Sequence, residues 1–207
     1  MNKGILVVVS GFSGAGKGTV MKELMRRYDN YALSVSVTTR APRPGEEDGR
    51  EYFFRTKEEF EQLIREDALI EYAGYVDNYY GTPRSYVEQK LEEGKDVILE
   101  IEIQGAMKVK EKNPETLLVF VTPPTVEELK RRLEGRGTEK ADVIASRLSR
   151  AAEEAEGMDA YDYILINDDL DECVERMHAL IQSEHFRMSR NTEFINRIKE
   201  ESKAFNK

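Results

Sequence analysis

The stretch that decides the fold is Gly11-Phe12-Ser13-Gly14-Ala15-Gly16-Lys17-Gly18-Thr19. It follows an apolar run over residues 5–10 and leads into a helical pattern over residues 20–28. A strand, a glycine-rich turn and a helix in this order present backbone N–H groups and a helix N-terminus to an anion. Lys17 adds a full positive charge. The alternative is a surface turn with an exposed lysine, but the preceding strand favours a loop that binds the phosphates of a nucleoside triphosphate.

Position 18 departs from the usual phosphate-binding loop. The residue after the lysine is ordinarily Ser or Thr, whose hydroxyl can reach Mg²⁺. This chain has Gly18 there, and the hydroxyl comes one residue later at Thr19. The sequence leaves direct binding of the metal by Thr19 open. The residues expected to hold the triphosphate are Gly11, Ser13, Gly14, Ala15, Gly16, Lys17, Gly18 and Thr19.

Length and composition restrict the class of protein. The chain has 207 residues, 40% hydrophobic and 34% charged, with a net charge of −9, which fits one globular unit. The acidic balance argues against non-specific nucleic-acid binding, and no apolar stretch has membrane-spanning length. Cys173 is the only cysteine, so we expect no internal disulfide and a cytoplasmic location. His178 and His185 are expected to be packing or surface residues.

The order of elements predicts an α/β fold. Apolar runs at 5–10, 97–101, 117–121 and 163–166 are typical of buried parallel strands, and helical patterns cover 16–28, 104–112, 126–134, 140–156 and 170–188. Alternating runs at 34–39, 52–55, 69–73 and 78–81, with a helix over 56–66, predict a small, mostly antiparallel sheet. We therefore expect a P-loop parallel sheet core with helices on both faces (1–33, 93–124 and 158–207), an inserted small mixed α/β domain (34–92) and a helical lid (125–157).

A polar strand and a loop with two arginines stand out in the inserted part. In the run 34–40, period two places Ser34, Ser36, Thr38 and Arg40 on one face. A half-exposed strand would give the same pattern. Arg40 and Arg43 then lie close together on a loop stiffened by prolines, and two guanidinium groups repel each other unless an anion lies between them. This favours a polar, anionic ligand.

Long motifs in order make the chain resemble the guanylate kinases, nucleoside monophosphate kinases of the P-loop NTPase class. They are SVSVTTRAPRPGEEDGREYFF, LIEYAGYVDNYYGTP, EIEIQGA, VFVTPP, LEGRGTE, SRL and IND. The resemblance extends over nearly the whole chain. It implies that Arg40, Arg43, Tyr52 and Tyr80 hold the phosphate of GMP, and that Glu71, Ser36 and Thr82 recognise guanine. Glu71 would accept hydrogen bonds from N1 and N2, while the two hydroxyls would donate to O6.

The resemblance also assigns residues to ATP and to the transfer step. It implies that Lys17, Arg40, Arg136 and Arg147 are catalytic, that Asn167 borders the adenine through backbone contacts, and that Glu100 contacts Mg²⁺, its waters or the guanine amino group. Thr19 and Glu100 are the candidate metal ligands, directly or through water. Glu102 shares a face with Glu100. The remaining lid arginines, Arg131, Arg132 and Arg150, are expected to be ordinary surface charges.

The implied reaction is transfer of the γ-phosphoryl group of ATP to GMP, and to dGMP, with Mg²⁺ as cofactor. The phosphate of GMP is already an anion and needs no general base, which agrees with the lack of a candidate catalytic histidine. The substrates are small molecules, with no nucleic-acid or membrane partner expected and a homo-oligomer left open. Two alternatives remain: a non-catalytic guanylate-kinase-like binding module, and a kinase for AMP, UMP or dTMP. A regulatory GTPase would need an NKxD-type motif, which the sequence lacks.

Overall fold

The larger sheet contains the strands predicted for the core. The computed structural model describes residues 3–75, 77–135 and 141–205. The sheet has the order β2-β7-β1-β8-β9, and all its neighbouring strands are parallel. Its strands are β1 (Leu6–Gly11), β2 (Tyr31–Leu33), β7 (Asp96–Glu100), β8 (Leu117–Thr122) and β9 (Tyr163–Ile166). The predicted P-loop α/β fold is confirmed, and the short edge strand β2 is an addition to it.

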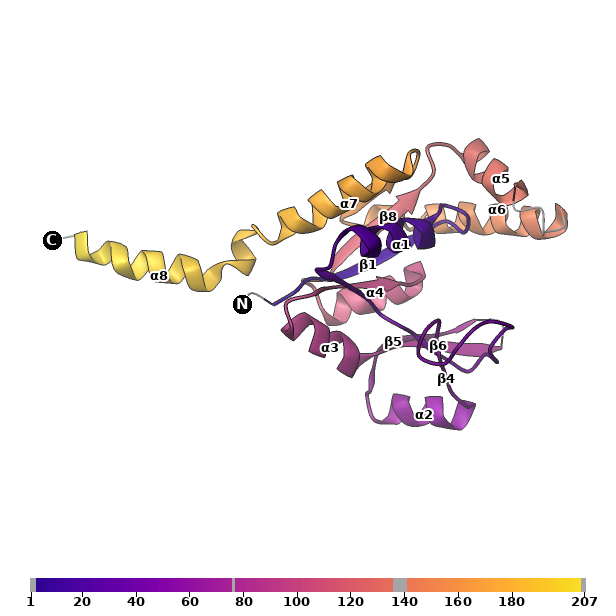
Figure 1. The fold of residues 1–207 in the computed structure, drawn as a ribbon, viewed down its shortest axis with the longest axis horizontal. Helices are drawn as coiled ribbons and strands as arrows, with labels where there is room; N and C mark the ends of the chain where they lie inside the picture. The colour runs from indigo at the N-terminus through magenta and orange to yellow at the C-terminus, as the bar shows by residue number, and fades with distance from the viewer. Residues whose placement is uncertain (1–2, 76, 136–140, 206–207) are drawn as a thin grey trace.

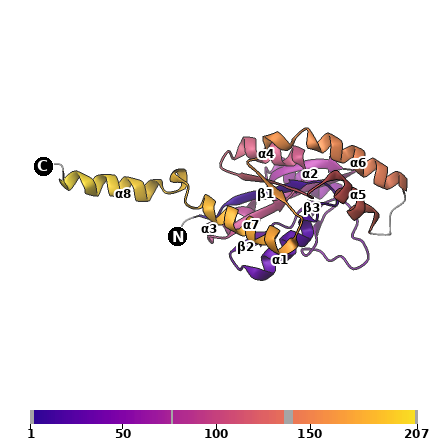
Figure 2. The same ribbon diagram turned by 90° about the horizontal axis from the view of Figure 1, so that it is seen from above.

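Helices cover both faces of this sheet (Figures 1 and 2). The side chains of β1 alternate: Val7 and Val9 pack toward α1 (Lys17–Arg27) and α7 (Leu170–Glu184), whereas Leu6 and Val8 pack toward α3 (Arg84–Glu92) and α4 (Ile103–Lys112). A strand buried on both faces needs apolar residues at every position, which explains the continuous run. Cys173 of α7 is fully buried, and burial raises its thiol pKa to about 11.

A second, smaller sheet lies within residues 34–92. It has the order β4-β3-β6-β5, where β3 pairs with β4 in parallel and β6 pairs antiparallel with both β3 and β5. These strands and the covering helix are β3 (Val37–Thr38), β4 (Phe53–Phe54), α2 (Lys57–Arg65), β5 (Leu69–Tyr75) and β6 (Asn78–Pro83). Thr56 and Glu59 form a capping box that starts α2, and Phe60 of this helix is fully buried.

The predicted alternation over residues 34–39 is wrong in extent. Only Val37 and Thr38 form a strand, and both are buried. The Thr38 hydroxyl donates to the Tyr79 carbonyl at 3.0 Å and therefore holds two strands together. Ser36 and Arg40 still line a common cleft, so the polar face of this segment is shorter than period two predicts.

The segment 125–157, predicted to form a lid, contains α5 (Val126–Glu134) and α6 (Ala141–Ala155). Thr125 caps α5 by accepting a hydrogen bond from the Glu128 backbone N–H. The predicted site residue Arg136 lies outside the described residues. No helix in the described part of the chain is both long enough and apolar enough to cross a membrane.

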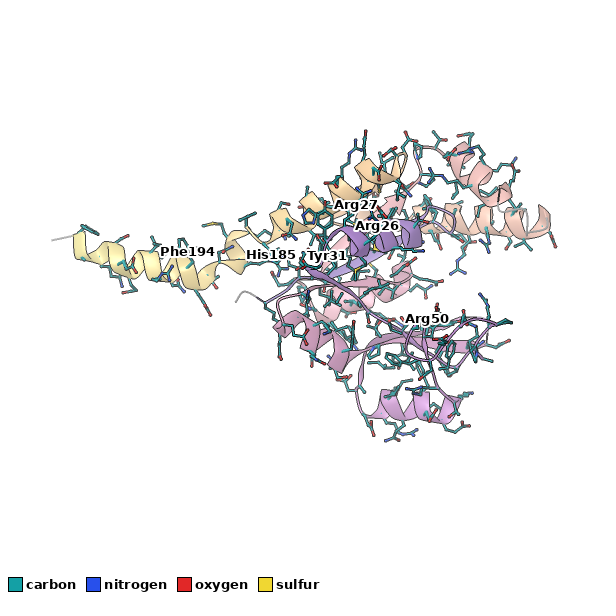
Figure 3. The ribbon with its side chains drawn as sticks, viewed as in Figure 1. Arg26, Arg27, Tyr31, Arg50, His185 and Phe194 are labelled. Atoms are coloured by element: carbon teal, nitrogen blue, oxygen red, sulfur yellow. The ribbon has the colours of Figure 1, made fainter. Side chains whose placement is uncertain are left out.

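The C-terminal part differs most from expectation. Helix α7 ends at Glu184, before the predicted end at 188, and α8 (Thr192–Ser202) follows after a short turn. Helix α8 projects from the body of the molecule, and Phe194 lies on this projecting arm (Figures 1 and 3). His178 stacks on Tyr28 at 3.7 Å, and His185 contacts the buried Asp96 at 2.9 Å. Both histidines are therefore packing residues, as predicted.

Candidate functional site

The glycine-rich loop between β1 and α1 takes a conformation that requires its glycines. Gly11, Gly14 and Gly16 have φ values of 144°, 98° and 89°, a region that residues with a Cβ atom rarely adopt. A Cβ atom on Gly14 would also come within 2.8 Å of Leu133. The loop then enters α1 at Lys17, so its backbone N–H groups and a helix N-terminus face one place.

Lys17 and Arg147 bring positive charge to the front of this loop. The Lys17 ammonium donates to the carbonyls of Gly11 at 2.7 Å and Phe12 at 3.2 Å. Arg147 reaches across from α6 and donates to the Ser13 hydroxyl at 3.2 Å. Both cations therefore converge where loop N–H groups would meet a phosphate.

Asn167 and Arg132 support the loop from behind. The Asn167 side-chain amide donates to the Ala15 carbonyl at 2.8 Å, and Arg132 donates to the Asn167 carbonyl at 2.9 Å. The expectation that Arg132 is an ordinary surface charge is wrong, because its guanidinium reaches the loop and Asn167. The Asn167 N–H also has a partner, the Thr122 carbonyl at 2.8 Å. Backbone groups expected to border the adenine are thus engaged within the protein.

A cleft of about 280 Å³ opens beside the loop. Residues from the loop, the end of β7 and helix α6 line it, among them Ser13, Lys17, Glu100, Arg147, Arg150 and Glu154. Arg150 pairs with Glu102 at 2.8 Å and with Glu154 at 3.2 Å. Arg150 is therefore a cleft residue that links α6 to Glu102, just after the end of β7, which corrects its assignment as a plain surface charge.

Glu100 lies at the carboxyl end of β7 and lines the same cleft as the glycine-rich loop. Desolvation raises the pKa of its carboxyl group, and the charge of Lys17 opposes that shift. A Cβ atom built on Gly18 would lie 4.0 Å from Glu100 Oε2. The carboxylate thus lies next to the position where other loops place a hydroxyl for Mg²⁺. Thr19 is exposed on the first turn of α1.

This donor set fits Mg²⁺ bound together with a nucleotide. In such sites one or two carboxylates hold the ion, and substrate phosphates and waters complete its coordination. Glu100 supplies one carboxylate at the edge of the phosphate cleft. Within the described ranges, no group of three or more His, Cys, Asp or Glu side chains is arranged to hold a metal ion.

A second cleft, of about 370 Å³, is lined by residues of the 34–92 segment and by residues within 100–105, at and just after the end of β7. It brings together most of the residues expected to bind GMP, namely Ser36, Arg40, Arg43, Tyr52, Glu71, Tyr80 and Glu100. Arg40 lies over the Tyr52 ring at 5.3 Å, and the rings of Tyr52 and Tyr80 are 5.9 Å apart. Burial, followed by the neighbouring Tyr80, raises the pKa of Tyr52, which keeps its hydroxyl able to donate.

A carboxylate of the chain itself contacts both arginines, Arg40 through its guanidinium and Arg43 through its backbone N–H. Glu46 pairs with Arg40 at 2.9 Å and accepts the Arg43 backbone N–H at 2.8 Å. The Arg43 N–H is the largest influence that lowers the pKa of Glu46; Arg40 adds to it, and desolvation opposes both. Sequence reasoning missed Glu46, although three acidic residues follow the second arginine closely.

Glu71, which lines this cleft, is almost fully buried. It is 5% exposed, and Thr82, which is fully buried, donates its hydroxyl to Glu71 Oε1 at 2.8 Å. The single proton of Thr82 is therefore committed to Glu71 rather than directed at a base. Burial raises the pKa of Glu71, against the opposing influence of Thr82, Lys108 and Lys112.

Gly105 of α4 lies against the other oxygen of Glu71. A Cβ atom at this position would be 3.0 Å from Glu71 Oε2. Sequence reasoning gave Gly105 no role, since a glycine inside a helical pattern carries no signal for the neighbour it faces. The two clefts meet along Glu100, Ile101 and Glu102, which line both of them.

Comparisons with known proteins agree with this geometry. A family model described as guanylate kinase matches residues 3–184. Guanylate kinase of Lactococcus lactis is 55% identical over 188 residues, which are 91% of this chain and 92% of that protein. The corresponding enzyme of Oceanobacillus iheyensis is 51% identical over 199 residues, 96% and 97% of the two chains. The crystal structure of guanylate kinase from Anaplasma phagocytophilum matches with a TM-score of 0.74 and 35% identity, covering 91% of this chain and 90% of that one.

Proposed function

The chain belongs to the guanylate kinase family, and we propose that its two joined clefts transfer the γ-phosphoryl group of ATP to GMP, giving ADP and GDP. One observation carries this proposal. The cleft beside the glycine-rich loop and the cleft of the two arginines share Glu100, Ile101 and Glu102. A phosphate held by Lys17 in one cleft and a phosphate held by Arg40 in the other would therefore lie on either side of these shared residues, close enough to react.

On the donor side, the loop holds the triphosphate of ATP. Its backbone N–H groups and Lys17 neutralise charge on the β- and γ-phosphates, and Arg147 approaches from the lid. We assign the same task to Arg136, on the resemblance alone. When bound, Mg²⁺ neutralises further charge on the phosphates, and Glu100 with Thr19 would hold it directly or through water.

On the acceptor side, Arg40, Arg43, Tyr52 and Tyr80 hold the phosphate of GMP. Arginine forks and phenolic hydroxyls suit phosphate oxygens, and Glu46 keeps Arg40 in place before the substrate arrives. Ionised Glu71 accepts hydrogen bonds from N1 and N2 of guanine, and Ser36 donates to O6. Thr82 acts through Glu71, because its proton already points to that carboxylate.

The reaction then needs alignment rather than a general base. A phosphate oxygen of GMP is already anionic and attacks the γ-phosphorus in line with the leaving ADP oxygen. Lys17, Arg147 and the loop N–H groups stabilise the charge that moves onto the phosphoryl oxygens. Closure of the 34–92 and 125–157 segments would exclude water, which otherwise competes as the acceptor. We infer that this takes place in a reducing cytoplasm, since the lone Cys173 is buried and unpaired.

Lys17→Ala tests the proposal directly. Lys22→Ala is the matched control, because Lys22 is exposed on the same helix α1 and lines neither cleft. We expect Lys17→Ala to lower kcat by on the order of a hundredfold or more, with the melting temperature of both variants close to that of the parent. Near-normal turnover in folded Lys17→Ala protein would overturn the assignment of the loop.

A further inference from the structure

One carbonyl of the phosphate-binding loop is held from outside the cleft by two side chains. The Ala15 carbonyl accepts the Asn167 amide at 2.8 Å, in a buried hydrogen bond. Arg132 Nη1 approaches the same oxygen at 3.4 Å, while its Nη2 donates to the Asn167 carbonyl at 2.9 Å. Asn167 follows β9 in the core and Arg132 belongs to α5, so two separate segments converge on a single peptide group.

The orientation of that carbonyl fixes the orientation of the next N–H group. A trans peptide is planar, and its C=O and N–H bonds point to opposite sides. None of the described peptide bonds is cis. Because the Ala15 carbonyl points toward Asn167, the Gly16 N–H points the opposite way, into the loop that Lys17 closes.

Gly16 itself shows how tightly the two parts fit. A Cβ atom at this position would lie 2.5 Å from the Asn167 amide nitrogen, and the residue has a φ of 89°. Only glycine lets Asn167 approach the loop backbone this closely. The contact is therefore a specific fit between the loop and the residue that follows β9.

Arg132 is itself held in place by a charged partner. Its Nε donates to Glu128 Oε1 at 2.6 Å, and Glu128 lies one turn earlier on α5. Hydrogen bonds from Arg131 and Arg132 lower the pKa of Glu128 to about 2, against desolvation. Glu128 thus stays ionised at neutral pH and keeps the guanidinium directed at the loop.

We propose that Asn167 and Arg132 are positioning residues that hold the Ala15–Gly16 peptide so that the Gly16 N–H faces the donor phosphates. This inference rests on the proposed role of the loop as the cradle of the ATP triphosphate. Neither side chain has to touch the nucleotide for this effect. Since Arg132 lies on α5 of the lid segment, the lid and the core jointly set the shape of the loop.

Tripolyphosphate with Mg²⁺ is the probe that separates this role from contact with adenine, because it carries the phosphates and no base. Its affinity, measured by calorimetry, is compared with that of ATP in Asn167→Ala, Asn167→Asp and Arg132→Ala proteins. Arg131→Ala is the matched control: Arg131 also pairs with Glu128, but its side chain is 76% exposed and makes none of the loop contacts described for Arg132. Lys17→Ala is included to test the loop itself.

We expect Asn167→Ala, Asn167→Asp and Arg132→Ala to weaken tripolyphosphate and ATP by the same factor, on the order of tenfold. The Arg131→Ala protein should bind both ligands as the parent does. The KM for GMP should remain unchanged in all of the Asn167 and Arg132 variants. Weakened ATP binding with parental tripolyphosphate binding would overturn the inference and assign both residues to the adenine. Parental binding of both ligands would overturn it as well. If Lys17→Ala also bound tripolyphosphate like the parent, the proposed role of the loop would fail first.

Arg132→Ala keeps the test sound if changes at the buried Asn167 prevent folding. Arg132 is partly exposed, with 22% of its side chain accessible, so its replacement should leave a folded protein. Folding is checked by the melting temperature of each variant. The inference then stands or falls on the Arg132→Ala and Arg131→Ala pair alone.

Discussion

The Thr82 hydroxyl lies 2.8 Å from Glu71 Oε1; both side chains are buried, and Glu71 lines the cleft that we propose binds GMP. The hydroxyl proton takes one acceptor position on Oε1 and holds the carboxylate in one orientation, while further acceptor positions remain on Oε1 and on the second oxygen, Oε2. Gly105 leaves room for that second oxygen, because a Cβ atom there would lie 3.0 Å from it. The carboxylate is therefore preset for a partner with two donors, as guanine is.

Removing the Thr82 hydroxyl should weaken GMP selectively. In Thr82→Val the buried carboxylate loses a hydrogen bond, which costs about 1–3 kcal/mol, and we expect the KM for GMP to rise roughly tenfold. The KM for ATP should hardly change. Thr39→Val is the control, since Thr39 also joins strands of the small sheet but contacts Asn78 and Tyr79 instead of Glu71. Equal effects of the two substitutions on GMP would contradict the positioning role.

Glu71→Gln should impair recognition of guanine more than of any other part of the substrates. The amide keeps the size of the side chain but replaces one acceptor oxygen with a donor that faces the guanine donors. We expect the KM for GMP to rise by roughly 10- to 100-fold, the range of a lost hydrogen bond to a charged group. Initial-rate kinetics with each substrate varied in turn provide the comparison. A similar rise in the KM for ATP would remove Glu71 from base recognition.

The same residue predicts a pH dependence with a definite sign. Burial raises the pKa of Glu71, and only the ionised form accepts on both oxygens without turning a proton toward the guanine donors. The advantage of the parent over Glu71→Gln in kcat/KM for GMP should be complete above this pKa and decline as the pH falls through it. Taking the ratio of the two proteins cancels the titration of the GMP phosphate, whose second pKa is about 6. A ratio that begins to decline only at the ordinary glutamate pKa of about 4.3 would count against a raised pKa for Glu71.

Glu46 should separate the effect of charge from that of position. Glu46→Gln retains groups that can hydrogen-bond Arg40 and the Arg43 N–H, but it removes a negative charge near the expected phosphate. We expect the KM for GMP to fall severalfold, because less repulsion opposes the phosphate. Glu46→Ala loses the contacts as well, so its KM should rise. If both variants shifted the KM in the same direction, Glu46 would not hold Arg40 for the substrate.

The spacing of apolar residues in the sequence was sufficient to predict the strands that are buried on both faces. The run in β1 is apolar at every position because helices cover both sides of the sheet. The edge strand β2 has three residues and therefore too little sequence to show a period. Helix α8 lies where the sequence carries no motif. Its Phe194 is 54% exposed on the projecting arm, so an apolar residue in this helix does not mark a buried position.

The candidate site shows a similar division. Charged residues near a motif can be found, but their partners depend on the tertiary structure. Arg131 and Arg132 are neighbours in the sequence and both pair with Glu128, yet only Arg132 is seen to reach Asn167 and the Ala15 carbonyl. The single helical step between them, about 100°, decides which one faces the loop. Pairing of Glu46 with Arg40 depends in the same way on how the intervening loop folds back.

The most direct test of the account is to measure ADP formation from ATP in the presence of Mg²⁺ in a coupled assay. GMP, dGMP, AMP, UMP and dTMP are offered in turn as acceptors. We predict turnover with GMP, weaker turnover with dGMP, and almost none with AMP, UMP or dTMP. The reason is that, among these bases, only guanine presents two donors to Glu71 and an acceptor to Ser36. Comparable turnover with AMP, UMP or dTMP would contradict the recognition of guanine. An absence of turnover with every acceptor, in folded protein, would contradict the kinase itself.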